Sequence, residues 1–175
     1  MSLIDYFKQL AAYHVWACDR LVEGMAEDLA EDDYRRDVGL FFQSVHGTLN
    51  HLLVAEHLWQ IRLIDHKPAR IALHAELHAD RQLLAGELQA MARRWPVWLD
   101  GLSDKVFNEP LTYTRNNGEA LTLPMAATLG HIFNHATHHR GQITAALTTM
   151  GLKPAELDWV FLLQQQARGA SSAPT

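Results

Sequence analysis

The segment LFFQSVHGTLNHLLVAEHLWQIRLI, residues 40–64, is apolar around most of its circumference when it is drawn as a helix. A helix of this kind is stable in water only when other elements cover it on several sides. The helical pattern ends where Lys67 and Pro68 interrupt it. This segment therefore predicts a well-buried helix at the centre of a helical fold.

Three further segments carry helical patterns that can cover the central helix. Residues 3–29 space their apolar side chains in threes and fours. Residues 73–99 carry a similar pattern, in which Pro96 is expected to bend or shorten the end of the helix. A fourth long pattern begins near Pro124 and runs to about Met150.

Shorter elements complete the expected fold. Alternating residues in 111–124 flank Asn116-Asn117-Gly118, which predicts a turn and a small hairpin. Residues 154–166 predict a short extra helix, and the small residues of 167–175 predict a flexible tail. We therefore expect an all-α protein, a four-helix bundle with a short extra C-terminal helix, in one domain that spans residues 1–166.

Composition restricts the classes of function. The chain of 175 residues is 48% apolar and carries a formal net charge of −5, so no basic surplus points to nucleic acid. No segment approaches the roughly 20 apolar residues of a membrane span. Cys18 is the single cysteine, which excludes an internal disulfide and favours a reducing, cytoplasmic setting. Any metal site must therefore be built from His, Asp or Glu.

The segment HIFNHATHHRGQ, residues 131–142, concentrates four of the eleven histidines. Residues four apart on a helix lie one turn above each other, about 6 Å apart along the axis, so two imidazoles at this spacing can converge on one ion. His131 with His135, and His135 with His139, both satisfy the spacing. Spacing alone therefore leaves both pairs open.

The apolar stripe of the same helix separates these histidines. From the middle of the stripe, His139 is offset by about 60° and His135 by about 100°, whereas His131 and His138 lie at about 140° to 160°. His135 and His139 are therefore expected to border the core, and the other two to lie outside it. The stripe consists of Leu129, Ile132, Phe133, Ala136, Ile143 and Leu147.

A third histidine ligand would have to come from another helix. The central segment contains His46, His51 and His57. Its apolar positions are too many for periodicity to choose among them. The residues by themselves therefore leave the third ligand undecided.

Two segments together resemble the DinB-like (damage-inducible) proteins, which are also grouped as YfiT-like metalloenzymes. They are SVHGTLNHLLVAEHLW, residues 44–59, and HIFNHATHHRGQI, residues 131–143, of which the HxxxHRGQ ending is the specific part. The resemblance extends from YHVWACDRL to GLKPAELDWVFLL, so it covers almost the whole chain. It implies a four-helix bundle, a homodimer and a divalent metal ion, usually nickel or zinc. The implied metal ligands are His51, His135 and His139.

Three other residues, beyond the metal ligands that the resemblance implies, have roles that the sequence leaves open. His14 stands where such sequences often have Asn; it either reaches the metal site or is a buried histidine bonded to a backbone carbonyl. Glu56 and Arg140 fall among apolar positions of their helices. They either pair with each other inside the bundle or extend to water.

Two functional hypotheses follow. Three imidazoles leave coordination positions open, and a bound ion lowers the pKa of a water or thiol that contacts it. Relatives that resemble this fold include thiol S-transferases and a thiol-dependent maleylpyruvate isomerase. We therefore expect a metal-dependent enzyme of the thiol S-transferase or hydrolase type, with a small-molecule substrate and a low-molecular-weight thiol as partners. The alternative is a non-catalytic, metal-stabilised bundle that acts in metal binding or in a stress or DNA-damage response. No catalytic residue is assigned from the sequence.

Overall fold

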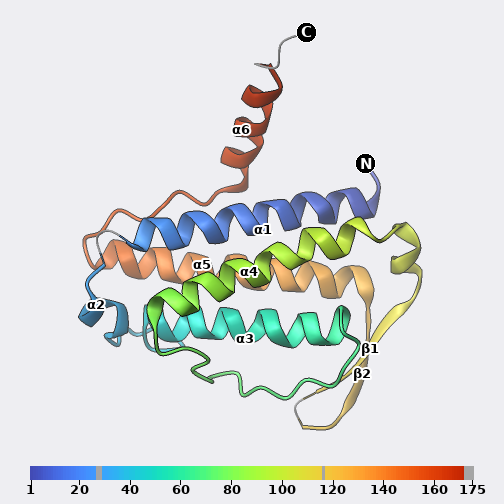
Figure 1. Ribbon diagram of the computed structural model, residues 1–175, viewed down its shortest axis with the longest axis horizontal. Coiled ribbons are helices and arrows are strands. Elements are labelled where there is room, and N and C mark those ends of the chain that lie inside the picture. Colours follow the sequence, from blue (N-terminus) through green and yellow to red (C-terminus); the bar gives the residue numbers. More distant parts are fainter. Residues whose placement is uncertain (27–28, 116, 172–175) are drawn as a thin grey trace.

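Four long helices lie side by side in the computed structural model of the protein (Figure 1). The structure describes residues 1–26, 29–115 and 117–171. This arrangement confirms the expected four-helix bundle. The four helices are α1 (Leu3–Ala26), α3 (Val45–Leu63), α4 (Arg81–Asp100) and α5 (Met125–Thr149). Within the described residues, no helix is long and apolar enough to cross a membrane.

The shorter elements lie at the ends of the bundle. The expected hairpin is present: β1 (Pro110–Thr114) pairs antiparallel with β2 (Ala120–Pro124), and Gly118 in the turn has a φ of +88°. Asn116 of the predicted turn lies outside the described residues. A one-turn helix, α2 (Glu31–Arg35), lies between α1 and α3, and the 3-10 helix η1 (Asp104–Asn108) precedes the hairpin.

The C-terminal helix α6 (Trp159–Ser171) projects away from the bundle (Figure 1). It begins later than the expected helix 154–166 and continues into the segment 167–175 that was expected as a tail. Its first residue holds it to the bundle, because the Trp159 ring stacks on Tyr13 with centroids 5.7 Å apart. Residues 172–175 lie outside the described residues.

The helix expected at 73–99 begins only at Arg81, and residues 64–80 form an irregular connection along α3. The side chain of Asn50 explains the difference. Its Oδ1 accepts hydrogen bonds from the backbone amides of Leu77 (2.7 Å) and His78 (3.1 Å). These bonds satisfy backbone amides of the irregular connection, which the apolar spacing of the segment did not reveal.

The helix α4 also continues through Pro96 to Asp100, so the proline does not shorten the helix, which was one of the two effects expected of it. Proline removes one backbone hydrogen bond from a helix. Here the neighbouring side chains compensate, because Trp95 and Leu99 are both fully buried in the core. Packing of the last turn therefore outweighs the lost hydrogen bond.

The helix α3 is buried on every side, as the sequence predicted. It begins at Val45, after Ser44 caps its first turn by accepting a hydrogen bond from the Gly47 amide. Residues 40–44 of the expected helix therefore lie outside it. The apolar residues that α3 contributes to the core are Val45, Leu49, Leu52, Leu53, Val54, Leu58 and Leu63.

A buried network of polar side chains joins all four long helices. The carboxylate of Glu56 on α3 lies 2.9 Å from His14 Nε2 on α1, and its other oxygen accepts a hydrogen bond from Trp95 on α4 (2.6 Å). Gln60 donates to the same oxygen (2.9 Å). Arg140 on α5 lies 3.0 Å from His14 Nδ1. Each of these side chains is at least 96% buried.

The hydrogen positions in this network follow from what each group can donate. A guanidinium has only donors, so Arg140 donates to His14 Nδ1, and His14 Nε2–H then donates to Glu56. His14 therefore links Arg140 to Glu56. It is buried, as one of the two alternatives from the sequence had it, but its partners are these two side chains instead of a backbone carbonyl, and it does not join the candidate metal ligands. Burial alone would raise the pKa of Glu56, but the bonds from His14, Trp95 and Gln60 hold that pKa below its ordinary value.

We predict that Glu56→Gln lowers the free energy of unfolding by about 3 kcal/mol. The substitution keeps the shape of the side chain but removes the negative charge that compensates Arg140. The Gln amide also has only one oxygen, so it cannot accept all the hydrogen bonds that the Glu56 carboxylate accepts. Urea unfolding of both proteins measures the loss.

Glu87→Gln is the matched control, because the Glu87 side chain is 35% exposed and pairs with His57 near the surface. We expect it to cost less than about 1 kcal/mol. Equal losses in the two variants would contradict a special role of the buried network.

Candidate metal centre

Three imidazoles converge between α3 and α5. His51 Nε2 and His139 Nε2 each lie 3.1 Å from His135 Nε2. One ligand atom from each residue falls within 4.8 Å of the others. These three residues form a site that could hold a metal ion, and they are the three that the resemblance implied.

The helical stripe correctly separated the histidines of α5. His139 is buried and His135 half-buried, whereas His131 and His138 are exposed. Within the described residues, neither exposed histidine joins the group of possible ligands. The burial of His139 and His135 on the same side of α5 brings their rings within 4.4 Å of each other, centroid to centroid.

The structure also decides among the histidines of α3. His51 joins the centre, whereas His46 Nε2 lies 2.7 Å from Glu76 and His57 Nε2 lies 2.9 Å from Glu87. At about 100° per residue, His51 leaves α3 on a different side from His46 and His57, which share a side about three turns apart and meet different neighbours. Only the tertiary arrangement distinguishes them.

Two hydrogen bonds orient the imidazoles. His51 Nδ1 donates to the backbone carbonyl of Leu73 (2.8 Å), and His139 Nδ1 donates to Gln142 Oε1 (2.7 Å). With the hydrogen on Nδ1, the lone pair of each ring lies on Nε2 and points at the centre. Sequence reasoning missed both acceptors, although Gln142 belongs to the HRGQ ending that carried the resemblance.

The donor set fits a divalent ion. His135 Nε2 can carry only one hydrogen, yet it faces two Nε2 lone pairs at 3.1 Å. The two contacts therefore cannot both be hydrogen bonds, and at least one of the facing Nε2 lone pairs receives no hydrogen, an arrangement that a cation between the rings would relieve. Metal–nitrogen bonds of 2.0 to 2.1 Å and a separation of 3.1 Å between nitrogens correspond to an angle of about 100° at the ion, which suits a first-row metal.

The three imidazoles are neutral at pH 7. Burial, together with the neighbouring histidines, lowers the pKa of His135 to about 3. Burial likewise lowers the pKa of His139 to about 4, although the bond to Gln142 opposes the shift. The pKa of His51 is also lowered, mainly by burial. Neutral imidazole is the form that binds metals, so the site is in its binding state.

A short segment before α3, residues 40–44, covers one side of the centre, and we call it the strap. The ring of Phe42 stacks on His51, with centroids 3.8 Å apart and planes 16° apart, and meets His139 edge-on at 5.7 Å. Gln43 takes a φ of +67° to turn the strap into the helix. Gly47 lets the strap approach closely, because a Cβ there would lie 2.1 Å from the Phe42 carbonyl oxygen.

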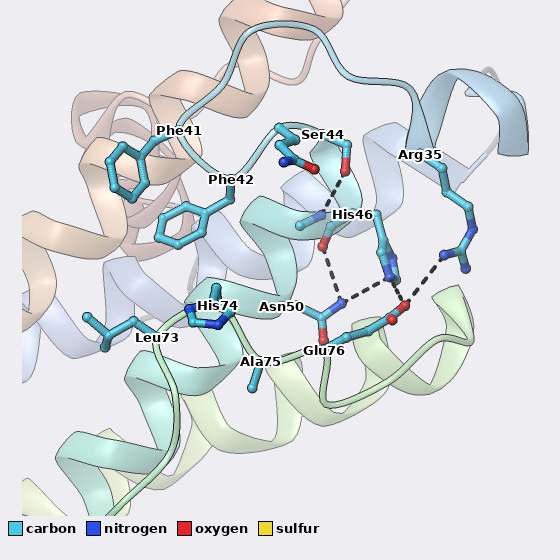
Figure 2. A pocket seen from close by; sticks show the side chains of 12 residues that line it. Arg35, Phe41, Phe42, Ser44, His46, Asn50, Leu73, His74, Ala75 and Glu76 are labelled. Atoms are coloured by element: carbon cyan, nitrogen blue, oxygen red, sulfur yellow. Dashed lines mark hydrogen bonds and ion pairs between the residues drawn. The ribbon is translucent and has the colours of Figure 1, made fainter. Parts of the chain in front are cut away.

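Two cavities flank the centre. The larger, of about 650 Å³, is lined by Phe42 and Leu73 among others, and none of the three candidate metal ligands lines it (Figure 2). Its polar side carries Glu76, which pairs with His46 and lies 3.6 Å from Arg35. The smaller cavity, of about 500 Å³, opens directly onto His51 and His135. The centre is therefore closed by Phe42 on one side and accessible from the smaller cavity.

The bundle and its three convergent imidazoles define a helical protein with a candidate metal centre. A model of the DinB family matches residues 1–170, so the chain belongs to the DinB family. Protein DinB of Bacillus subtilis (strain 168) is 26% identical over 166 residues, which cover 91% of this chain and 94% of that relative.

A solved structure supports the fold. It is described as "YfiT from Bacillus subtilis is a probable metal-dependent hydrolase with an unusual four-helix bundle topology". The two structures superpose with a TM-score of 0.62 at 24% identity, over 86% of this chain and 89% of the other. This chain is therefore similar to YfiT in the arrangement of its helices.

We predict that Gly47→Ala destabilises the protein and weakens divalent metal binding by about tenfold or more, because groups that support metal ligands affect affinity on this scale. The new Cβ would displace the Phe42 carbonyl and so move the ring that packs on His51. Thermal unfolding and a zinc titration, each in the purified protein, measure the two effects.

Gly86→Ala on α4 is the matched control, because a Cβ there meets no atom within 4 Å. It should stabilise the helix by about 1 kcal/mol and leave zinc affinity unchanged. Normal zinc affinity in Gly47→Ala would show that the strap does not support the site.

Proposed function

We propose that this protein is a metal-dependent enzyme in which His51, His135 and His139 hold one divalent ion, nickel or zinc. The observation that carries the proposal is the convergence of three neutral imidazoles at the end of a cavity of about 500 Å³. Histidine nitrogens suit both metals. Two of the three side chains also line the cavity, so a small molecule in it would meet the centre directly.

An open coordination sphere favours catalysis over a structural role. Within the described residues, no fourth His, Cys, Asp or Glu joins the three imidazoles. His14, which the sequence offered as a further candidate, is bonded to Glu56 in the buried network instead. Structural zinc sites have four protein ligands, whereas catalytic sites keep a position for water or substrate.

The chemistry supported by this arrangement is the activation of a water or a small thiol. A divalent ion held by the three imidazoles would lower the pKa of a water or thiol in contact with it and would so supply a nucleophile near pH 7. The Leu73 carbonyl and Gln142 hold two of the imidazoles in the binding orientation. Phe42 keeps water from one face of His51. The description of YfiT as a metal-dependent hydrolase and the resemblance to thiol S-transferases agree with this class of reaction.

We also propose that the protein works as a cytoplasmic homodimer. The projecting helix α6 leaves Val160 and Leu163 49% and 44% exposed, and a second copy could cover them. The free thiol of Cys18 suits a reducing compartment.

Light scattering at micromolar concentration should give twice the mass of the chain, and Leu163→Glu should lower that mass. A monomer mass for the unmodified protein would contradict the dimer.

The function is tested on protein purified without a His-tag or a nickel column. Elemental analysis should find one divalent ion per chain. After exchange into cobalt, addition of a small thiol should shift the visible spectrum, because sulfur enters an open position next to the histidines. Bound metal at a hundredfold excess over its Kd should stabilise the protein by about 3 kcal/mol.

Two variants control this experiment. His135→Ala should lose the ion, the stabilisation and the spectral shift, whereas the exposed His138→Ala should keep all three. A tightly held metal with a spectrum that no thiol or substrate changes would favour the alternative, a non-catalytic metal-stabilised bundle. Absence of any metal affinity would overturn both functions.

A further inference from the structure

The smaller cavity extends from the metal centre along one face of α3. His51, Ala55, Leu58 and Arg62 line it and recur every three or four residues, so they share that face. The helix rises about 1.5 Å per residue, which places Arg62 about 16 Å along the axis from His51. The cavity therefore has a metal-binding end and a distinct second end.

Aromatic rings form a continuous wall between the two ends. The His131 ring lies 5.7 Å from the His135 ring, and Trp59 lies 5.7 Å from His131, centroid to centroid. Tyr113 of the hairpin then meets Trp59 edge-on at 5.4 Å. The middle of the cavity thus offers apolar and aromatic contacts, which suit a carbon chain or a ring.

The second end is cationic. The Arg62 guanidinium carbon lies 4.7 Å from the Tyr113 ring centroid and 5.2 Å from that of Trp59, so two rings position it. Arg115 also lines the cavity and pairs at 3.0 Å with the exposed Glu119. No described Asp or Glu lines the cavity.

The Arg62 side chain is also charged, and its surroundings favour the binding of an anion. Burial lowers the pKa of Arg62, and the nearby positive charge of Arg115 adds to this shift, while Tyr113 opposes it. A guanidinium in this situation remains charged. A negative group beside the two guanidiniums would relieve their mutual repulsion and would gain a charge-assisted hydrogen bond.

We propose that the cavity selects elongated small molecules that carry a metal-binding group at one end and a carboxylate at the other. The metal-binding group would bind the ion that His51, His135 and His139 hold, the apolar middle would lie against Trp59, and the carboxylate would be held by Arg62. This inference rests on the proposed function, because it assigns a substrate class to the same centre. It adds a specificity-determining residue, Arg62, that lies about three helical turns from the metal ligands.

The test compares two thiols that differ only at the far end: 6-mercaptohexanoate and 6-mercaptohexan-1-ol. Calorimetric titration of the full-length, cobalt-loaded protein measures the Kd of each. We expect the acid to bind at least about tenfold more tightly than the alcohol, since a hydrogen bond between charged groups is lost in the alcohol. The preference should decrease as sodium chloride is raised, because salt screens the interaction.

Arg62→Gln should reduce the preference for the acid to less than about twofold and leave the affinity for the alcohol unchanged. Arg94→Gln is the matched control, because Arg94 is an exposed residue of α4 that pairs with Asp65 outside this cavity. It should keep the full preference. If Arg62→Gln does not fold, the salt dependence of the unmodified protein decides the question.

The outcomes separate this inference from the proposed function. Equal affinities of the unmodified protein for the two thiols, or a salt-independent preference, would overturn the selection of carboxylates and leave the metal-dependent enzyme in place. A preference that survives in Arg62→Gln would overturn the role of Arg62. Failure of both thiols to bind the cobalt-loaded protein would overturn the thiol-dependent function together with the inference.

Discussion

The carboxylate of Glu56 is the point on which the arrangement of the helices depends. It is 96% buried, and its partners come from three of the four long helices, with Arg140 of the last helix reached through His14. A shift of α3 against α5 by one turn would leave Glu56 and Arg140 buried without compensation, at a cost of about 3 to 5 kcal/mol. The same two helices carry the candidate metal ligands, and Arg140 directly follows His139. The network therefore also sets the register that brings the three imidazoles together.

The candidate metal centre depends equally on groups that are not ligands. Asn50 holds the irregular connection of residues 64–80 against α3, and that connection supplies the Leu73 carbonyl that orients His51. Phe42 closes one face of the site. The opposite face opens into a cavity whose far end is cationic. The candidate site therefore has a closed, supported side and an open side that leads to the cationic end of the cavity.

Local patterns in the sequence were sufficient for the helices and for part of the site. The apolar spacing of 3.6 residues predicted the four long helices, and the turn residues around Gly118 predicted the hairpin. The apolar stripe of α5 selected His135 and His139 over His131 and His138, because a helix turns by the same angle at every residue. His51 came from the resemblance to the DinB family instead, since a helix that is buried on all sides has no stripe from which to measure an angle.

The contacts between helices were decided by the tertiary structure alone. Glu56 and Arg140 looked like a direct pair or two surface side chains, but His14, more than forty residues before Glu56 in the chain, lies between them. The late start of α4 has the same origin, because Asn50 satisfies backbone amides that would otherwise have entered a helix. Periodicity reports which face of an element is apolar, and that is a local property of the chain. Which buried polar groups meet across the core depends on distances between residues far apart in sequence, and those distances exist only once the helices have packed.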